Sequence, residues 1–223
     1  PINTNTIYDL NFFTNSIVDF INKLKIKDIT IAGESIGANL AASVSVKLPK
    51  SVKKILLFNP YDYDSYFGEG IRRGNFFANF ILFHISLPII GNIFSSLENK
   101  FILRNVMGGG FINPDNLSDE YLDLLCTSLK KKGYVYHFRN VLQKFKENNE
   151  IKEIYKKIKV PVKLVYGIDD WANESERLQT QKLLKLDKYH VINNCKHFSF
   201  LENSKDVLRI LNTWILEFLN IIF

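Results

Sequence analysis

Residues 29–42 have the sequence ITIAGESIGANLAA. An apolar run comes first, the pentapeptide Gly33-Glu34-Ser35-Ile36-Gly37 follows, and a stretch of small residues comes last. This order predicts a strand, a sharp turn and a helix, with glycines that lack a Cβ where the three crowd together. It is the context in which a G-x-S-x-G turn presents a serine as nucleophile. Ser35 is therefore the candidate nucleophile, and an ordinary tight strand-to-helix turn is the alternative.

Composition narrows the class of protein. The chain has 223 residues, of which 46% are hydrophobic and 23% charged, so we expect one globular core with an insertion. The formal net charge is +6, but the lysines are spread along the chain and form no basic stripe interleaved with aromatic residues. This pattern excludes a nucleic-acid partner, and the basic balance indicates solvated surface.

The cysteines and the first residues of the chain indicate the cellular compartment in which the protein is expected. Cys126 and Cys195 lie far apart and have no metal-ligand spacing, so the sequence predicts neither a disulfide framework nor a zinc site. A reducing compartment follows, and we expect a cytoplasmic protein. The residues after Pro1 show no basic region followed by an apolar core, so no signal peptide is predicted. The sequence does not specify an oligomeric state.

Hydrophobic periodicity predicts strands that alternate with helices. Helical spacing of apolar residues predicts a helix from Tyr8 to Leu24. Further helices are expected at Glu174 to Leu186 and from about Ser204 to the end. Short apolar runs predict further buried strands at residues 54–58, 162–166 and 189–193. The alternation indicates an α/β fold, with a parallel sheet covered by helices on both faces.

The regular alternation stops between the predicted strands at residues 54–58 and 162–166, which predicts an insertion. We expect an α/β core at residues 1–60 and 160–223 and a helical cap or lid at residues 61–159. Within the insertion, residues 74–97 carry no charge but contain Pro88 and Gly91, which favours two short helices over a membrane span. Membrane contact through the cap is the alternative. Helices are also expected at residues 118–130 and 134–145, with a flexible joint at residues 108–110.

A serine hydroxyl needs a base to take its proton and an acid to orient that base. In open α/β sheets, reacting groups gather beyond the carboxyl ends of the strands. Asp169 and Asp170 follow one predicted strand, and His197 follows the next. The order Ser, Asp, His along the chain is the order that α/β-hydrolases use.

Three motifs together resemble the α/β-hydrolase superfamily, in the serine-nucleophile branch with a helical cap. They are residues 33–37, the Pro-Val-x-x-x-x-Gly-x-x-Asp segment at residues 161–170, and residues 197–203, where His is followed by apolar residues and a Glu-Asn pair. The similarity runs from about Asp9 to Phe218. It implies the α/β-hydrolase fold: a mostly parallel sheet, helices on both faces, and a helical cap inserted between the sixth and seventh strands.

The resemblance also implies roles for individual residues. Ser35 corresponds to the nucleophile, His197 to the general base and Asp170 to the acid, with Asp169 as the nearest competitor for the acid. Asp62 and Asp64 are further alternatives, because they follow a strand after which some members of the superfamily carry their acid. The other histidines are not expected to act as the base, since His190 begins a strand at the wrong edge of the sheet, and His84 and His137 fall in the cap.

The oxyanion site needs two backbone N–H donors. Ile36, the residue after the nucleophile, corresponds to the first. The second comes from a loop after an early strand in the superfamily, and only one helix precedes the Ser35 strand here. We therefore expect that the early strands and the second donor are missing from this chain, that it is truncated at its N-terminus, and that it is weakly active or inactive as given.

These observations predict a serine hydrolase that cleaves a carboxylic ester or thioester with an apolar group, and that needs no metal and no organic cofactor. The apolar group is suggested by aromatic residues in the predicted cap, which could equally pack the cap itself: Tyr66, Phe76, Phe77, Phe80 and Phe83. Acyl transfer, lactone opening and carbon–carbon bond hydrolysis would use the same residues. Epoxide and haloalkane chemistry is disfavoured, since those relatives carry Asp at the position of Ser35. A noncatalytic ligand-binding protein on the same scaffold is the alternative of another class.

Overall fold

The computed structural model describes residues 6–66, 68–145 and 149–216. The chain divides into two compact units. The helical unit comprises Pro1–Phe12 with Tyr63–Asn148, and the sheet unit comprises Phe13–Asp62 with Asn149–Phe223. The outer ends of the predicted core, residues 1–5 and 217–223, lie outside the described residues.

The sheet unit is built on a parallel sheet with the strand order β1-β2-β3-β4. Its strands are β1 (Ile29–Glu34), β2 (Val52–Phe58), β3 (Val162–Gly167) and β4 (His190–Ile192). Each pair of neighbours runs parallel. The predicted parallel α/β sheet is confirmed, and every strand expected from an apolar run is present.

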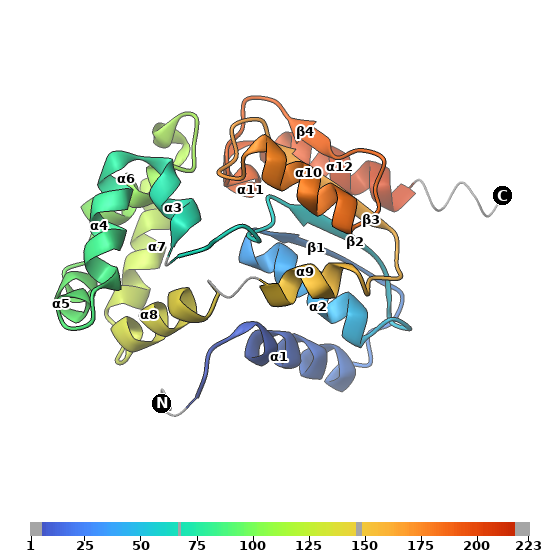
Figure 1. Cartoon of the computed structure of the whole chain (residues 1–223), viewed down its shortest axis with the longest axis horizontal. Helices are drawn as coiled ribbons and strands as arrows, with labels where there is room; N and C mark the ends of the chain where they lie inside the picture. The colour runs from blue at the N-terminus through green and yellow to red at the C-terminus, as the bar shows by residue number, and fades with distance from the viewer. Residues whose placement is uncertain (1–5, 67, 146–148, 217–223) are drawn as a thin grey trace. The chain divides into compact units, whose positions relative to one another are not determined.

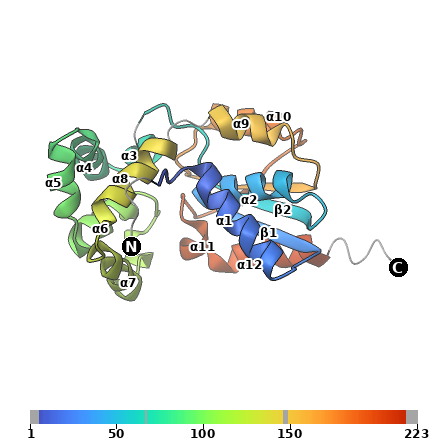
Figure 2. The ribbon, with the colours of Figure 1, turned by 90° about the horizontal axis from the view of Figure 1, so that it is seen from below.

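Helices cover both faces of this sheet. In the sheet unit they are α1 (Leu10–Lys23), which belongs to this unit from Phe13 onward, α2 (Ile36–Lys47), α9 (Asn149–Tyr155), α10 (Glu174–Leu183), α11 (Ser199–Glu202) and α12 (Ser204–Leu216). Figure 1 shows α2 and α9 side by side along the sheet. Figure 2 shows α9 and α10 on one side of the strands and α11 and α12 on the other. The α12 face is closed by a core cluster that includes Leu56, Val165 and Val207.

The strands are in a register that brings their carboxyl ends together. Glu34 of β1 pairs with Phe58 of β2, which pairs with Val165 of β3. Gly167, at the end of β3, pairs with Ile192 at the end of β4. The turns and loops that follow the strands therefore leave the sheet along one edge.

The helical unit contains α3 (Glu69–Gly74), α4 (Phe76–Ser86), α5 (Ile90–Ser96), α6 (Lys100–Gly108), a 3₁₀ turn (Pro114–Asn116), α7 (Asp119–Leu129) and α8 (Tyr134–Phe145). The uncharged stretch of residues 74–97 forms α4 and α5, as expected. Leu87 takes an extended conformation before Pro88, because the proline ring disfavours a helical residue ahead of it. Across the described residues, no helix combines the length and the apolarity that a bilayer crossing requires.

Two packing features hold the helical unit together. Ile81, Leu82 and Ile85 of α4 form an apolar cluster with Leu142 of α8. The buried Arg139 guanidinium of α8 donates to the carbonyl oxygen of Leu87 at 3.0 Å and fixes the α4–α5 connection.

The glycines at residues 108–110 are not the flexible joint that we expected. They are buried, and a Cβ on Gly109 would lie only 2.7 Å from the backbone of Gly74. Glycine is needed there because α3 and α6 pack backbone against backbone.

The turn between β1 and α2 holds Ser35 in an uncommon conformation. Its backbone angles are φ 57° and ψ −125°, a region that costs a residue with a Cβ on the order of 1–3 kcal/mol. A Cβ on Gly33 would lie 2.1 Å from the carbonyl oxygen of Gly37, so the turn closes only with glycine at position 33. A Cβ on Gly37 would meet nothing within 4 Å. The expectation that both glycines are needed for close packing is therefore wrong for Gly37.

This difference gives a matched pair of substitutions. We expect Gly33→Ala to lower the free energy of unfolding by roughly 3 kcal/mol or more, because backbone atoms must move apart. Gly37→Ala should be neutral or stabilising by up to about 1 kcal/mol, because alanine favours a helix more than glycine. Urea unfolding of the two variants measures both effects. Equal destabilisation by the two substitutions would contradict this account of the turn.

Candidate functional site

Three predicted residues meet at the carboxyl edge of the sheet. The Oγ atom of Ser35 lies 2.8 Å from Nε2 of His197, and Nδ1 of His197 lies 2.5 Å from Oδ1 of Asp170. His197 is fully buried, and Asp170 is 7% exposed. Ser35 follows β1, Asp170 lies in the loop between β3 and α10, and His197 lies in the loop between β4 and α11.

The partners of the imidazole ring determine its tautomer. An ionised carboxylate can only accept a hydrogen bond, so Nδ1–H of His197 donates to Asp170. The lone pair on Nε2 is then directed to Ser35, whose hydroxyl donates to it. This arrangement can take a proton from the serine and can stabilise the imidazolium ion that results.

Two residues that sequence reasoning missed hold His197 in place. The indole ring of Trp171 stacks on the imidazole, with centroids 3.9 Å apart and an interplanar angle of 15°. The buried Asn59, which follows β2, donates through Nδ2 to the carbonyl oxygen of His197 at 2.7 Å. Its Oδ1 accepts from the N–H of Gly167 at 2.7 Å. Asn59 therefore ties the end of β3 to the loop that carries His197.

The alternative acids have other partners. Asp169 is exposed. Asp62 is buried, and its Oδ2 accepts from the hydroxyl of Thr180 at 2.7 Å. Asp64 accepts from the N–H groups of Glu69 and Gly70 at the start of α3. Among these aspartates, Asp170 is the one that bonds to His197.

Burial changes the ionisation of Asp62. Loss of hydration raises the pKa of this carboxyl to about 6, although hydrogen bonds from Thr180 and Tyr155 and the charge of Lys152 act in the opposite direction. The negative charge of Asp170 raises it further. Asp62 thus changes charge in the mildly acidic range, next to the site.

The other histidines have surroundings of their own. His84 stacks on Phe94 with ring centroids 4.7 Å apart, and His137 packs edge-on against Tyr8, both within the helical unit. His190 begins β4, at the opposite end of that strand from the His197 loop.

The aromatic residues proposed for substrate contact differ in burial. Phe77 packs against the core cluster of the helical unit. Tyr66, Phe76, Phe80 and Phe83 are exposed.

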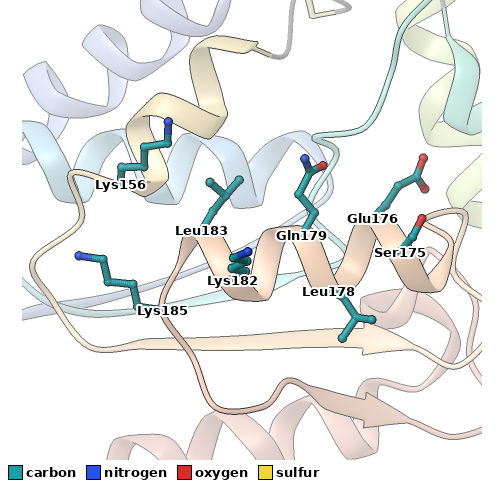
Figure 3. Close-up of a pocket in the computed structure, with 8 residues that line it drawn as sticks. All are labelled: Lys156, Ser175, Glu176, Leu178, Gln179, Lys182, Leu183 and Lys185. Atoms are coloured by element: carbon teal, nitrogen blue, oxygen red, sulfur yellow. The ribbon is translucent and has the colours of Figure 1, made fainter.

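A groove of about 750 Å³ runs along α10, and Figure 3 shows the side chains that line it. None of them is Ser35, Asp170 or His197. Its lysines, Lys156, Lys182 and Lys185, lie at or just beyond the carboxyl ends of α9 and α10, where cations balance the helix dipole. We therefore assign no chemistry to this groove.

Within the part of the chain that the structure describes, no group of three or more His, Cys, Asp or Glu residues could hold a metal ion.

Ile36 is the first residue of α2. The N–H groups in the first turn of a helix have no acceptor within that helix, so the N–H of Ile36 is available beside Ser35. The position is consistent with a donor to a negatively charged oxygen.

Comparison with known proteins identifies the fold. Neither a protein-family model nor a curated protein matches the sequence. Solved structures do match. A variant of the meta-cleavage product hydrolase of Pseudomonas fluorescens IP01 aligns with 100% of this chain and 76% of its own, at 16% identity and a TM-score of 0.71.

Two further solved structures match over similar lengths. An epoxide hydrolase aligns with 96% of this chain and 76% of its own, at 16% identity and a TM-score of 0.73. An esterase from Thermogutta terrifontis aligns with 95% of this chain and 74% of its own, at 12% identity and a TM-score of 0.67. These proteins share the α/β-hydrolase fold, and the chain described here has that fold too.

The raised pKa of Asp62 predicts how stability depends on pH. A carboxyl whose pKa rises from 3.8 to about 6 on folding favours the folded state below pH 3.8, and this contribution is lost as the pH rises through 6. Between pH 4 and pH 8, Asp62→Asn should therefore gain roughly 3 kcal/mol of stability relative to the unsubstituted protein. Urea unfolding at a series of pH values measures the difference. Asp169→Asn, which removes an exposed carboxyl, is the control, and parallel curves for Asp62→Asn and the unsubstituted protein would refute the prediction.

Proposed function

We propose that this chain, which has the α/β-hydrolase fold, is a serine hydrolase that cleaves a carboxylic ester or thioester through an acyl-enzyme. One observation carries the proposal: the continuous hydrogen-bonded path from Asp170 through His197 to Ser35, with lengths of 2.5 and 2.8 Å. A buried histidine between a carboxylate and a serine in an uncommon backbone conformation is costly to maintain. Nucleophilic catalysis supplies a reason for that cost.

The first half of the reaction acylates the serine. Oγ of Ser35 attacks the carbonyl carbon while Nε2 of His197 takes the hydroxyl proton. Asp170 stabilises the imidazolium ion, and the N–H of Ile36 donates to the developing oxyanion. The bond to the leaving group then breaks, and His197 gives its proton to the departing alcohol or thiol.

The second half releases the acid. A water molecule attacks the acyl carbon as His197 takes one of its protons. The ester bond to Ser35 breaks, the proton returns to Oγ, and a carboxylic acid leaves. The residues named here carry every proton transfer in this scheme.

We further propose that the substrate carries an apolar group. The exposed rings of Phe76, Phe80 and Phe83 form an apolar surface on α4, and exposed aromatic surface of this kind is suited to an acyl or alcohol chain. The helical unit would then act as the cap that selects substrates.

Labelling tests the nucleophile, and hydrolysis of an ester tests the acid. We expect a fluorophosphonate to form one adduct on Ser35 at neutral pH and Ser35→Ala to abolish it. Asp170→Asn should lower kcat on a chromogenic ester about a thousandfold or more, because the imidazole loses the partner that fixes its tautomer. Asp169→Asn, a change of the same kind at an exposed neighbour, should stay within about twofold. An intact protein without a Ser35 adduct would favour the ligand-binding alternative.

A substrate panel tests the apolar group. For p-nitrophenyl esters from two to twelve carbons, kcat/KM should rise with chain length by about threefold or more per two methylene groups until the chain is accommodated. Phe80→Ala should flatten this dependence and leave the two-carbon ester unaffected. A kcat/KM independent of chain length would contradict the apolar preference and leave the role of Ser35 intact.

A further inference from the structure

Glu34 precedes the proposed nucleophile and is the last residue of β1. Its half-buried side chain contacts the chain beyond His197. Oε1 of Glu34 accepts a hydrogen bond from the hydroxyl of Ser199 at 2.5 Å and another from the backbone N–H of Phe200 at 3.1 Å. The residues are separated by 165 and 166 positions in sequence, so these bonds join the two ends of the site.

The two donors lie at the start of α11. This helix has Phe198 at its N-cap, and no side-chain hydrogen bond caps it from that position. Glu34 supplies from another element the acceptor that a capping residue normally provides. The hydroxyl of Ser199 is fully buried, so loss of its acceptor would leave a polar group without water. Since His197 lies two residues before Ser199, the contact limits where the imidazole can move.

The charged groups around His197 come from several elements. Asp170 approaches from the loop after β3, and Glu34 approaches from β1 and interacts electrostatically with His197. Burial raises the pKa of Glu34, and the bonds from Ser199 and the charge of His197 lower it. The rings of Tyr61 and Trp171 also lie beside the imidazole. The thiol of Cys195, two residues before His197, stays protonated because burial raises its pKa and nearby carboxylates, including Glu202, raise it further.

We propose that Glu34 is a positioning residue for His197, an inference that rests on the proposed function. Glu34 fixes the start of α11 against the turn that carries Ser35, and its carboxylate stabilises the protonated imidazole. Asp170 orients the ring through Nδ1. Glu34 acts from the side of the nucleophile and touches neither the ring nor Ser35 Oγ by any hydrogen bond. In this proposal two carboxylates stabilise the imidazolium ion that forms in each half of the reaction: Asp170 is bonded to it, and Glu34 acts through space.

Substitutions separate the two parts of this role. Glu34→Gln keeps an oxygen acceptor for Ser199 and Phe200 but removes the charge. Ser199→Ala removes a donor and keeps the charge. Glu153→Gln removes the same charge from an exposed ion pair with Lys156 and serves as the control. If Glu34→Gln does not fold, the shorter pair Glu34→Asp and Glu34→Asn gives the same comparison of charge at constant length.

The pH profile of kcat/KM on a chromogenic ester reads out the charge. We expect Glu34→Gln to move the midpoint of the acid limb to lower pH by about half a unit or more, because the imidazolium ion loses a nearby negative charge. We expect Ser199→Ala to lower kcat about threefold or more and to leave the midpoint in place. Glu153→Gln should change neither quantity. A midpoint for Glu34→Gln equal to that of Glu153→Gln would overturn the electrostatic role, and unchanged kcat in Ser199→Ala would overturn the positioning role.

An NMR titration of His197 needs no turnover, so it tests the role of Glu34 independently of the proposed hydrolysis. The chain has four histidines, so a His197→Asn variant assigns the ring signal of His197 in a proton–carbon NMR spectrum. The titration midpoint of that signal should move to lower pH in Glu34→Gln, whether or not the protein hydrolyses an ester. If the midpoint shifts but Ser35 forms no adduct, the proposed hydrolase is refuted and the role of Glu34 is upheld. If Ser35 forms an adduct but the midpoint does not shift, the role of Glu34 is refuted and the proposed hydrolase is upheld.

Discussion

The parallel register of the sheet is the constraint on which the site depends. Because Glu34 pairs with Phe58 and Phe58 pairs with Val165, the chain leaves successive strands at the same level. Ser35, Asn59 and the loop that carries Asp170 therefore start from neighbouring points. A shift of one residue in any pair would turn the side chains of that strand to the opposite face and separate the groups. The turn at Gly33, the bridge at Asn59 and the stacking of Trp171 refine positions that the register has already set.

Much of this arrangement could be predicted from the sequence, because it rests on local patterns. Apolar runs locate the strands, and Pro88 divides the uncharged stretch into two helices. The order of strands also brings the loops after β1, β3 and β4 to one edge. What the sequence could not reveal are contacts that depend on side-chain direction. Asn59 looks like an ordinary residue at a strand exit, yet it bonds to both Gly167 and His197. Gly37 and Gly33 look alike in the motif, but only the Cβ position at Gly33 is occupied by backbone.

Several carboxyl groups lie in the sheet unit close to the site, and their surroundings give them different chemistry. Asp170 bonds to an imidazole that can carry the opposite charge. Glu34 accepts from a hydroxyl and a backbone N–H. Asp62 accepts from the hydroxyls of Thr180 and Tyr155, and these bonds together with the charge of Lys152 do not offset burial, so its pKa rises to about 6. Residue type alone does not distinguish these groups, since it is the charge and hydration of the partners that decide.

The hydrogen bond between Ser35 and His197 joins residues 162 positions apart. Such a contact closes a long loop, so the intervening chain must lose much of its conformational freedom before the contact contributes stability. The β1–α2–β2 segment, by comparison, closes through contacts between neighbours in sequence. During synthesis on the ribosome, the serine turn can therefore form while the histidine loop is still unmade. Until β4 and the loop that carries His197 have packed, a partly folded chain has the Ser35 turn but lacks the hydrogen bond on which the proposed reaction depends.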